Sequence, residues 1–392
     1  MYFQFVFAIL VVLFLYAKNV RTLEPIYGIY RDSSKYFYLK FCAMYLLLTL
    51  RRRKTADIEE LEKRHQLSEN PMAADAVYFH GVSDDNCILA LATAQRKNNR
   101  VNAFVILRIP EFSDQILVSP KWPDSTLIQT DSEYKDDHNY AVEGIKLTPI
   151  IPMRTWKLSY NGKLKLEKDQ SQTFDVKIDA IWTTNLPHYN FDTDMHPKPI
   201  AKAMAMEPWS KEYFKNLERF HQTHYEQHGD VRGTATIDGK DYTIFTNSLR
   251  DHTVADLRDW KNFHRYAIHF LTLENGDRLT VGAICTPVLF SSFVMGFITK
   301  AKLGVNHAIT DCDFKLYQHG EEEKPPTDYG FTFWAGGERY VVQALGYEKV
   351  EFYMGTEAEA RLVEQYTTCT VNGVRGWGFC EWCYRHVDGL PQ

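Results

Sequence analysis

Hydrophobic residues occur in short runs, separated by turn-forming residues, from Asp75 to the end of the chain. In some runs, such as 163–167, hydrophobic and polar residues alternate with the period of two that gives a strand one buried and one solvated face. The pattern predicts two series of antiparallel strands. The first series is 76–80, 87–93, 101–109, 157–160 and 173–181, and the second is 230–237, 241–246, 266–273, 278–286, 330–335, 338–345 and 373–386.

Three dipeptides typical of two-residue hairpin turns support this antiparallel pairing. They are Asn161-Gly162, Asp238-Gly239 and Asn275-Gly276. Both residues of such a pair tolerate the positive φ angles of a tight turn. We therefore expect a hairpin at each of the three positions.

Residues 199–228 depart from the strand pattern. Pro208 opens a stretch whose apolar residues recur with a spacing near 3.6, which predicts a helix. We therefore expect a mainly β fold in which two antiparallel β-barrel or sandwich domains, 75–198 and 229–392, are joined by a helical connector. The charged segment 55–74 is expected to be a solvated linker or a short helix. The sequence has no glycine-rich phosphate loop and no βαβ alternation, which argues against a nucleotide-binding α/β enzyme.

The N-terminus carries an apolar segment. Residues 1–17 are apolar apart from Gln4 and are followed by Lys18 and Arg21. This length is at the lower limit for a helix that crosses the hydrocarbon core of a bilayer. A cleaved signal peptide is the alternative, but the segment lacks a basic start and a small-x-small cleavage site. We therefore expect a membrane helix over 1–17.

A second apolar run, 36–50, is interrupted only by Lys40 and ends in the basic residues 51–54. Its short length and basic end favour a helix that lies in the membrane interface. A second membrane helix, paired with the first as a hairpin, and a buried helix of the globular part are the alternatives. Residues 1–54 are thus expected to form a single-pass or hairpin anchor. Because basic residues follow the first apolar segment, the positive-inside rule places the globular part in the cytosol.

Composition narrows the functional classes. The chain has 392 residues, a formal net charge of -5, 45% hydrophobic and 14% aromatic residues. Phosphate neutralisation needs a positive surface, so nucleic acid is not an expected partner. The 7 cysteines are thinly spread and do not resemble a disulfide framework, which favours a reducing compartment. The partner that these features predict is the lipid bilayer, and no protein partner can be named.

The densest polar cluster comprises 250–252 and 258–260, which follow a predicted strand. An aspartate beside a histidine can supply a proton donor and acceptor, and arginines can keep carboxylates ionised. A buried Arg–Asp network that ties a loop to the barrel is the structural alternative. The catalytic candidates are Asp251 and His252, with Arg250, Arg258, Asp259 and Trp260 in support.

Metal chemistry has weaker support. Segment 221–228 holds three histidines and Glu226, but it lacks the His-Glu-x-x-His order and no further ligand cluster follows. Cys380 and Cys383 form a lone C-x-x-C in a predicted strand, where positions i and i+3 point to opposite faces and cannot share a zinc ion. We therefore expect no metal site and no cofactor.

Glu381, near the end of the last predicted strand, has two interpretations. A glutamate that points into a barrel needs a partner, and Arg250 or Arg258 is available for it. A glutamate that points outward is a solvated charge. Both interpretations stay open at this point, and Tyr384 belongs to the same candidate region.

Two stretches of the sequence resemble a known family. They are 224–260, which contains Tyr-Glu-Gln-His-Gly, Leu-Arg-Asp-His-Thr and Arg-Asp-Trp, and the ending Gly-Trp-Gly-Phe-Cys-Glu at 376–381. Both resemble the carotenoid 1,2-hydratase, or hydroxyneurosporene synthase-like, superfamily, which includes lipocalin-like pericyclases. Segments 143–147 and 156–162 are also similar to animal phosphoenolpyruvate-synthase-like proteins. That second similarity does not reach the phosphotransferase module of those proteins and carries no activity.

The resemblance spans roughly residues 70–390 and implies two lipocalin-like β domains with a pocket for an apolar, often polyene or terpenoid, ligand. In the hydratases an aspartate protonates an alkene, which implies this role for Asp251 and His252. Val254 stands where the family commonly has a tryptophan, whose π face could stabilise a carbocation. The ligand-binding or supporting candidates are Arg250, Arg258, Asp259, Trp260, Glu226, Trp377, Glu381 and Tyr384.

Three functions are compatible with these expectations. The leading hypothesis is a membrane-anchored lipocalin-like protein that binds an apolar, lipid or terpenoid-like molecule and acts as a cofactor-independent hydro-lyase or isomerase. Alkene hydration, isomerisation or cyclisation needs only an acid and a base in a dry site. The alternatives are a lipid-binding protein without catalysis, and a structural or interaction module whose barrel interiors are filled by side chains.

Overall fold

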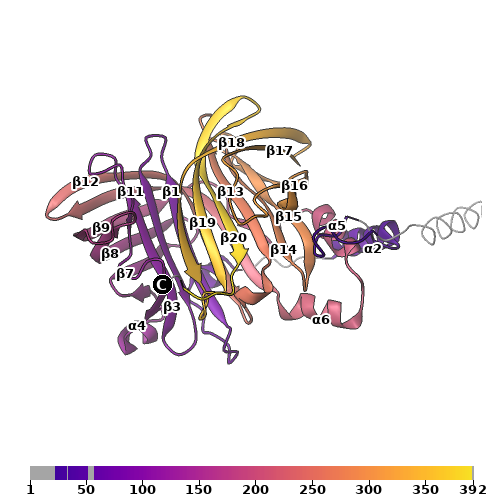
Figure 1. The fold of residues 1–392 in the computed structure, drawn as a ribbon, viewed down its shortest axis with the longest axis horizontal. Helices are drawn as coiled ribbons and strands as arrows, with labels where there is room; N and C mark the ends of the chain where they lie inside the picture. Colours follow the sequence, from indigo (N-terminus) through magenta and orange to yellow (C-terminus); the bar gives the residue numbers. More distant parts are fainter. Residues whose placement is uncertain (1–22, 33, 52–56, 391–392) are drawn as a thin grey trace, which may run out of the picture.

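The chain folds into two β-units that lie side by side, with the helices Phe37–Leu50, Pro197–Met206 and Lys211–Arg219 at one end (Figure 1). The computed structural model describes residues 23–32, 34–51 and 57–390. The predicted membrane helix 1–17 lies outside these residues. Within them the prediction of a mainly β fold is confirmed, because about half of the described residues are in strands and far fewer are in helices.

The strands of the first β-unit come from two separate parts of the sequence. They are β1 (Ala74–Val82), β2 (Ile88–Gln95), β3 (Arg100–Arg108), β4 (Leu117–Val118), β5 (Thr126–Ile128), β6 (Tyr140–Val142), β7 (Ile145–Ile151), β8 (Thr155–Leu166), β9 (Thr173–Thr183), β10 (Tyr189–Asn190), β11 (Gln222–Ile237) and β12 (Lys240–Ala255). Strand β9 pairs with both β8 and β11, so the hydrogen-bonded path β11-β12-β1-β2-β3-β4-β8-β9 returns to its start. We call this closed arrangement the first unit.

The second β-unit is a closed antiparallel barrel of consecutive strands, called the barrel below. Its last strand pairs with its first, so within the barrel no long edge is left open to another chain. The strands are β13 (Arg265–Leu273), β14 (Arg278–Thr286), β15 (Phe290–Lys300), β16 (Val305–Cys312), β17 (Asp328–Ala335), β18 (Glu338–Met354), β19 (Ala360–Val371) and β20 (Val374–Arg385).

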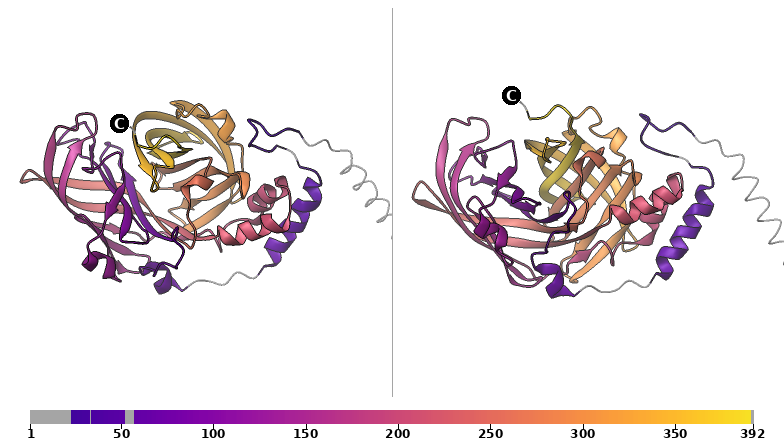
Figure 2. Two further views of the ribbon diagram at one scale, coloured as in Figure 1. Left: turned by 60° about the horizontal axis from the view of Figure 1, so that its bottom comes forward. Right: turned by 90° about the horizontal axis from the view of Figure 1, so that it is seen from below.

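The helices are short. The described ones are α2 (Phe37–Leu50), α3 (Ile58–Glu62), α4 (Asp131–Lys135), α5 (Pro197–Met206) and α6 (Lys211–Arg219), with 3-10 turns η1 (Trp260–Asn262) and η2 (Leu316–Gln318). Helix α5 lies between α2 and the barrel strand β15, at the end of the molecule away from the first unit (Figures 1 and 2). No helix among residues 23–32, 34–51 and 57–390 has the length and apolar character needed to cross a membrane.

The predicted boundary at residue 229 is wrong. It cuts through β11, and both β11 and β12 pair with first-unit strands rather than with the barrel. The predicted connector 199–228 therefore contains α6 and most of α5 but also the start of β11. Local hydrophobic spacing located a helix here correctly, but it carries no information about which distant strand a later strand will join.

Two of the three predicted hairpin turns are confirmed. Asp238-Gly239 joins β11 to β12, and Asn275-Gly276 lies between β13 and β14. Asn161-Gly162 instead lies inside β8, which continues through it to pair with β9. The turn of that region is Glu143-Gly144, where both residues have positive φ. Pairing along the whole of β9 overrides the local turn preference.

Each unit has its own packed interior. Phe79, Trp156 and Trp182 are among the buried residues inside the first unit. Trp382 and Phe333 are among those inside the barrel. A third apolar cluster lies between the two units, where Phe104 of β3 meets Phe352 of β18 with ring centroids 4.4 Å apart. Because successive residues of a strand point to opposite faces, every strand at this boundary contributes to one interior and to the interface.

Candidate functional site

The two catalytic candidates lie on opposite faces of β12. His252 points into the first unit, where its Nε2 lies 2.7 Å from Oδ1 of Asp75. Asp251 points to the interface, where its Oδ2 lies 2.7 Å from Nε2 of His224. The predicted Asp251–His252 acid/base pair is therefore wrong as a pair, because adjacent residues of an extended strand face opposite sides.

A row of polar side chains crosses three neighbouring strands of the first unit on its interface face. In the strand register, Glu226 of β11 lies opposite Asp251 of β12, and Asp251 lies opposite Tyr78 of β1. His224 stands two residues before Glu226, on the same face of β11, and its Nε2 lies 3.5 Å from Oε1 of Glu226. Because each strand places one of these groups by its period of two, the row needs no loop to position it.

His224 and Asp251 form an ion pair. Burial alone would lower the pKa of His224, but Asp251 and Glu226 raise it to about 10. Burial would raise the pKa of Asp251, but His224 and then Arg258 hold it below its ordinary value. Phe191 stacks on the His224 ring at a centroid distance of 4.4 Å and fixes its plane. His224 is therefore expected to carry a positive charge at neutral pH, balanced by the negative charge of Asp251.

A second polar row faces the first from the barrel. Glu364 of β19 lies opposite Glu381 of β20 in the strand register. The Tyr266 hydroxyl donates to Oε1 of Glu381 at 2.6 Å. The Tyr78 hydroxyl donates to Oε1 of Glu364 at 2.8 Å and so bridges the two units. Glu381 thus points neither into the barrel nor into open solvent, and both sequence interpretations of its direction are wrong.

The two barrel carboxyls share a site that disfavours two negative charges. Burial and the neighbouring Glu381 raise the pKa of Glu364 well above its ordinary value, and burial also raises the pKa of Glu381. Oε2 of Glu364 is buried and has no hydrogen-bond donor, so a proton on this carboxyl, shared with Glu381, satisfies it. The pair is a candidate proton donor at neutral pH.

These groups are buried or partly buried where the two units meet. The side chains of His224 and Asp251 keep 21% and 22% of their area exposed. Tyr78 and Glu381 are also partly buried. We call this set of polar side chains the interface recess. Partly buried hydrophobic residues at the same interface include Phe263, Ile284 and Phe293.

The interior of the first unit holds a separate polar network. Nδ1 of His252 lies 2.7 Å from the Tyr225 hydroxyl, which also contacts Oε1 of Glu62 at 2.8 Å. Glu62 of α3 forms an ion pair with Arg250. Burial would raise the pKa of Glu62, but Arg250 holds it below its ordinary value. Arg250 therefore ties the segment before β1 to the first unit, which is the structural alternative considered for it.

The segment 55–74 is not a solvated linker throughout. Glu62 is 2% exposed, and Leu61 packs with Met153 and Tyr225. The indole Nε1 of Trp156 also donates to Glu62, at 2.8 Å. The charge at position 62 predicted solvent exposure, but its cationic partner Arg250 is distant in the sequence.

The remaining candidates from the sequence, Arg258, Asp259 and Tyr384, lie in three different places. Arg258 lies near the interface recess and stacks on Trp260, its guanidinium carbon 5.1 Å from the ring centroid. Asp259 caps η1 by accepting from the Lys261 backbone N–H at 2.9 Å, so its role is structural. Tyr384 is buried inside the barrel and stacks with Arg265, away from the recess. Of the sequence candidates, the recess thus collects Glu226, Asp251, Arg258 and Glu381. Trp377 lies farther along the interface, where its indole Nε1 donates to Asn247 at 3.2 Å.

Sequence reasoning missed Tyr78, His224, Tyr266 and Glu364 as members of one site. His224 belongs to the histidine-rich segment 221–228 and lies in β11, where 224, 226 and 228 share a face. That alternation was visible in the sequence. The cross-unit contact between Tyr78 and Glu364 was not, because it joins residues 286 positions apart.

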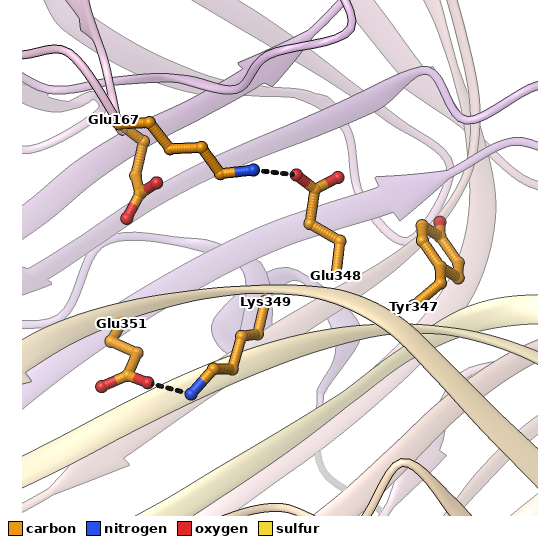
Figure 3. Close-up of a pocket in the computed structure, with 6 residues that line it drawn as sticks. Glu167, Tyr347, Glu348, Lys349 and Glu351 are labelled. Carbon is orange, nitrogen blue, oxygen red and sulfur yellow. Dashed lines mark hydrogen bonds and ion pairs between the residues drawn. The ribbon is translucent and has the colours of Figure 1, made fainter.

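A charged hollow also occurs on the surface, between the loop after β8 and strand β18 (Figure 3). Its volume is about 470 Å³. Lys168 pairs with Glu348 at 3.3 Å and Lys349 with Glu351 at 2.5 Å, so its charges are largely satisfied within it. This lining does not suit an apolar ligand.

Comparisons with known proteins support the fold. A family model described as a family of unknown function, DUF8627, matches residues 3–384, and no curated protein matches the sequence. A candidate AttH protein from Nitrosomonas europaea has a similar structure, with a TM-score of 0.59 at 13% identity over 86% of this chain and 99% of that chain. This likeness is consistent with the expected lipocalin-like fold.

Two further solved structures are more distant. Kievitone hydratase from Nectria haematococca has a TM-score of 0.45 at 11% identity, over 84% of this chain and 96% of that chain. CghA has a TM-score of 0.46 at 9% identity, over 82% and 90%. These two scores are too low to carry an argument. Neither the family nor these structures link the chain to phosphoenolpyruvate-synthase-like proteins.

Proposed function

Because the chain belongs to DUF8627, a family of unknown function, we propose its function from the site itself. We propose that an apolar small molecule binds in the interface recess and receives a proton from the Glu364–Glu381 pair. The observation that carries this proposal is the buried Glu364 Oε2, which has no donor and lies beside a second carboxyl. A carboxyl that keeps its proton at neutral pH is what general acid catalysis requires.

The opposite row supplies the complementary groups. Asp251 is ionised, so its negative charge can stabilise the positive charge that develops when the substrate is protonated, and it can then accept a proton from the substrate. Proton donation on one side and removal on the other completes an isomerisation, and capture by water completes an alkene hydration. Neither reaction requires a cofactor. His252 takes no part in this proposal, because it faces the interior of the first unit.

The apolar walls favour a hydrophobic ligand. Phe263 and Ile284 are partly buried next to Tyr266: the Phe263 and Tyr266 ring centroids are 5.8 Å apart, and Ile284 pairs with Tyr266 in the strand register. Sites with apolar walls and a few converging polar groups are typical of small-molecule binding. A lipid or terpenoid-like molecule fits this description, and a carrier without catalysis would use the same recess.

We also propose that the protein lies on a membrane, with the globular part on the cytosolic side. In α2, Phe41 and Met44 face the molecule, whereas Tyr38, Leu46 and Leu50 are 63%, 59% and 70% exposed. A helix that is hydrophobic on all sides is expected to be covered on all sides. The bilayer interface is a suitable cover for the outer face, and the apolar segment 1–17 supports the same placement.

The test compares the full-length protein with Glu381→Gln after incubation with a membrane-lipid extract, read by mass spectrometry. Asp259→Asn is the control, since Asp259 caps η1 and does not face the recess. We expect a new product from the wild type and the control only. A lipid that is retained unchanged by all three proteins would identify a carrier, and no retained lipid would contradict the proposal.

A further inference from the structure

A second cluster of ligating side chains lies inside the first unit, apart from the interface recess. It comprises His65, after α3, Asp75 of β1 and His252 of β12, and one nitrogen or carboxylate oxygen from each lies within 4.8 Å of the others. Asp75 and His252 have no exposed side-chain area, and His65 is 26% exposed. Two imidazoles and one carboxylate are a frequent ligand set for Zn²⁺ and related divalent ions.

Hydrogen bonding around His252 leaves one nitrogen for a cation. The Tyr225 hydroxyl lies 2.8 Å from both the Leu61 carbonyl and Oε1 of Glu62, and these two oxygens can only accept. Tyr225 has one proton to donate, so its 2.7 Å contact with His252 is made by Nδ1–H of the histidine. The Nε2 of His252 then faces Oδ1 of Asp75 at 2.7 Å, which requires a second ring proton or a metal ion between them.

His65 supplies the second, independent observation. Its Nδ1 is buried without a hydrogen-bond partner and lies 3.8 Å from Oδ2 of Asp75. An unpaired ring nitrogen beside a buried carboxylate is unfavourable unless a positive charge joins them. Oδ2 of Asp75 also accepts from the backbone N–H of His65 at 2.7 Å, which holds the two residues together. The Tyr140 hydroxyl lies 3.0 Å from the same oxygen and 3.2 Å from Nε2 of His252.

We propose that His65, Asp75 and His252 bind a divalent transition-metal ion of the Zn²⁺ type. The Tyr225–Glu62–Arg250 chain orients His252 from outside the ligand set, as outer partners commonly do in zinc sites. Zn–N and Zn–O bonds of about 2.0–2.2 Å require the His252–Asp75 contact to lengthen by roughly half an ångström. The ion links the segment after α3 to β1 and β12, and its role is to fix that segment in place.

The test titrates the metal-stripped full-length protein with Zn²⁺ against a coloured chelator. We expect one tightly bound equivalent in the wild type, a loss of at least tenfold in affinity in His65→Ala, and a loss of about 10- to 100-fold in Tyr225→Phe. His264→Ala is the matched control, because His264 is 23% exposed and pairs with Glu321 elsewhere. Equal Zn²⁺ binding by wild type and His65→Ala, or none by the wild type, would overturn the proposal.

Two further measurements are made on the wild type, so they do not depend on whether a variant folds. Co²⁺ added to the stripped wild type should give the visible absorption of a low-coordinate N/O site, while Mg²⁺ should compete poorly. Zn²⁺ should also slow amide exchange in 57–73, and unchanged exchange would contradict the proposed role. Glu381→Gln should bind Zn²⁺ like the wild type, so failure of the metal proposal and failure of the proposed function are distinguishable.

Discussion

Asp251 and His252 are adjacent in β12, yet their side chains lie on opposite faces of the strand and have different partners. The sequence placed both residues after a predicted strand, 241–246, whereas β12 continues to Ala255. Asp251, Glu226 and Glu381 meet at the interface. The sequence could not assign partners, because those come from other strands: His224 for Asp251, and Asp75 for His252. Alternation predicts which residues share a face, whereas tertiary pairing determines what that face meets.

The proton shared by Glu364 and Glu381 predicts that the free energy of unfolding depends on pH. The pKa of Glu364 is raised in the folded state, so its contribution to stability is complete below the unfolded value, about 4.3, and is lost as pH rises through the folded value. In that window the free energy of unfolding should fall by about 1.4 kcal/mol per pH unit. Glu364→Gln should remove this slope and be more stable than the wild type at neutral pH.

Urea denaturation of both proteins from pH 4 to pH 8 measures the difference. Plots of the free energy of unfolding against pH for the two proteins should converge near pH 4 and separate at higher pH. Parallel curves across the whole range would show that Glu364 ionises normally in the folded protein.

At the scale of elements, the short helix α3 is attached by a buried ion pair rather than by its length. Five residues are too few for a stable isolated helix. Glu62→Gln would leave the Arg250 charge buried without a counterion, which costs about 3–5 kcal/mol. Glu60→Gln on the same helix is the control, because Glu60 is 63% exposed and its pair with Lys63 contributes about 1 kcal/mol or less.

Denaturation midpoints and amide exchange of 57–66 would measure this effect. A loss in Glu62→Gln no larger than that in Glu60→Gln would show that α3 is held by apolar packing alone. The sequence offered both readings of this segment, a solvated linker or a short helix. It could not distinguish them, since Arg250 lies 188 positions away.

At the scale of the whole molecule, the proposed contact of α2 with a membrane can be tested. Cys42 is the one exposed cysteine of the seven and lies in α2. An environment-sensitive fluorophore on Cys42 should therefore shift to the blue when anionic vesicles are added. The same fluorophore on Leu345→Cys in a Cys42→Ser background should not shift, because Leu345 is an exposed barrel residue. Equal shifts at both positions would indicate unspecific adsorption.

The pairing of β12 with β1 has a consequence for synthesis. Ala74 pairs with Ala255, 181 positions later in the chain, so the first unit stays open until β12 has left the ribosome. Until then β1 and β9 present unpaired edges, and an aggregation-prone intermediate is expected. A fragment 57–198 should not unfold cooperatively in urea, whereas 57–255 should. A nascent chain of this protein is thus expected to need a holding chaperone for longer than a protein whose domains close in order.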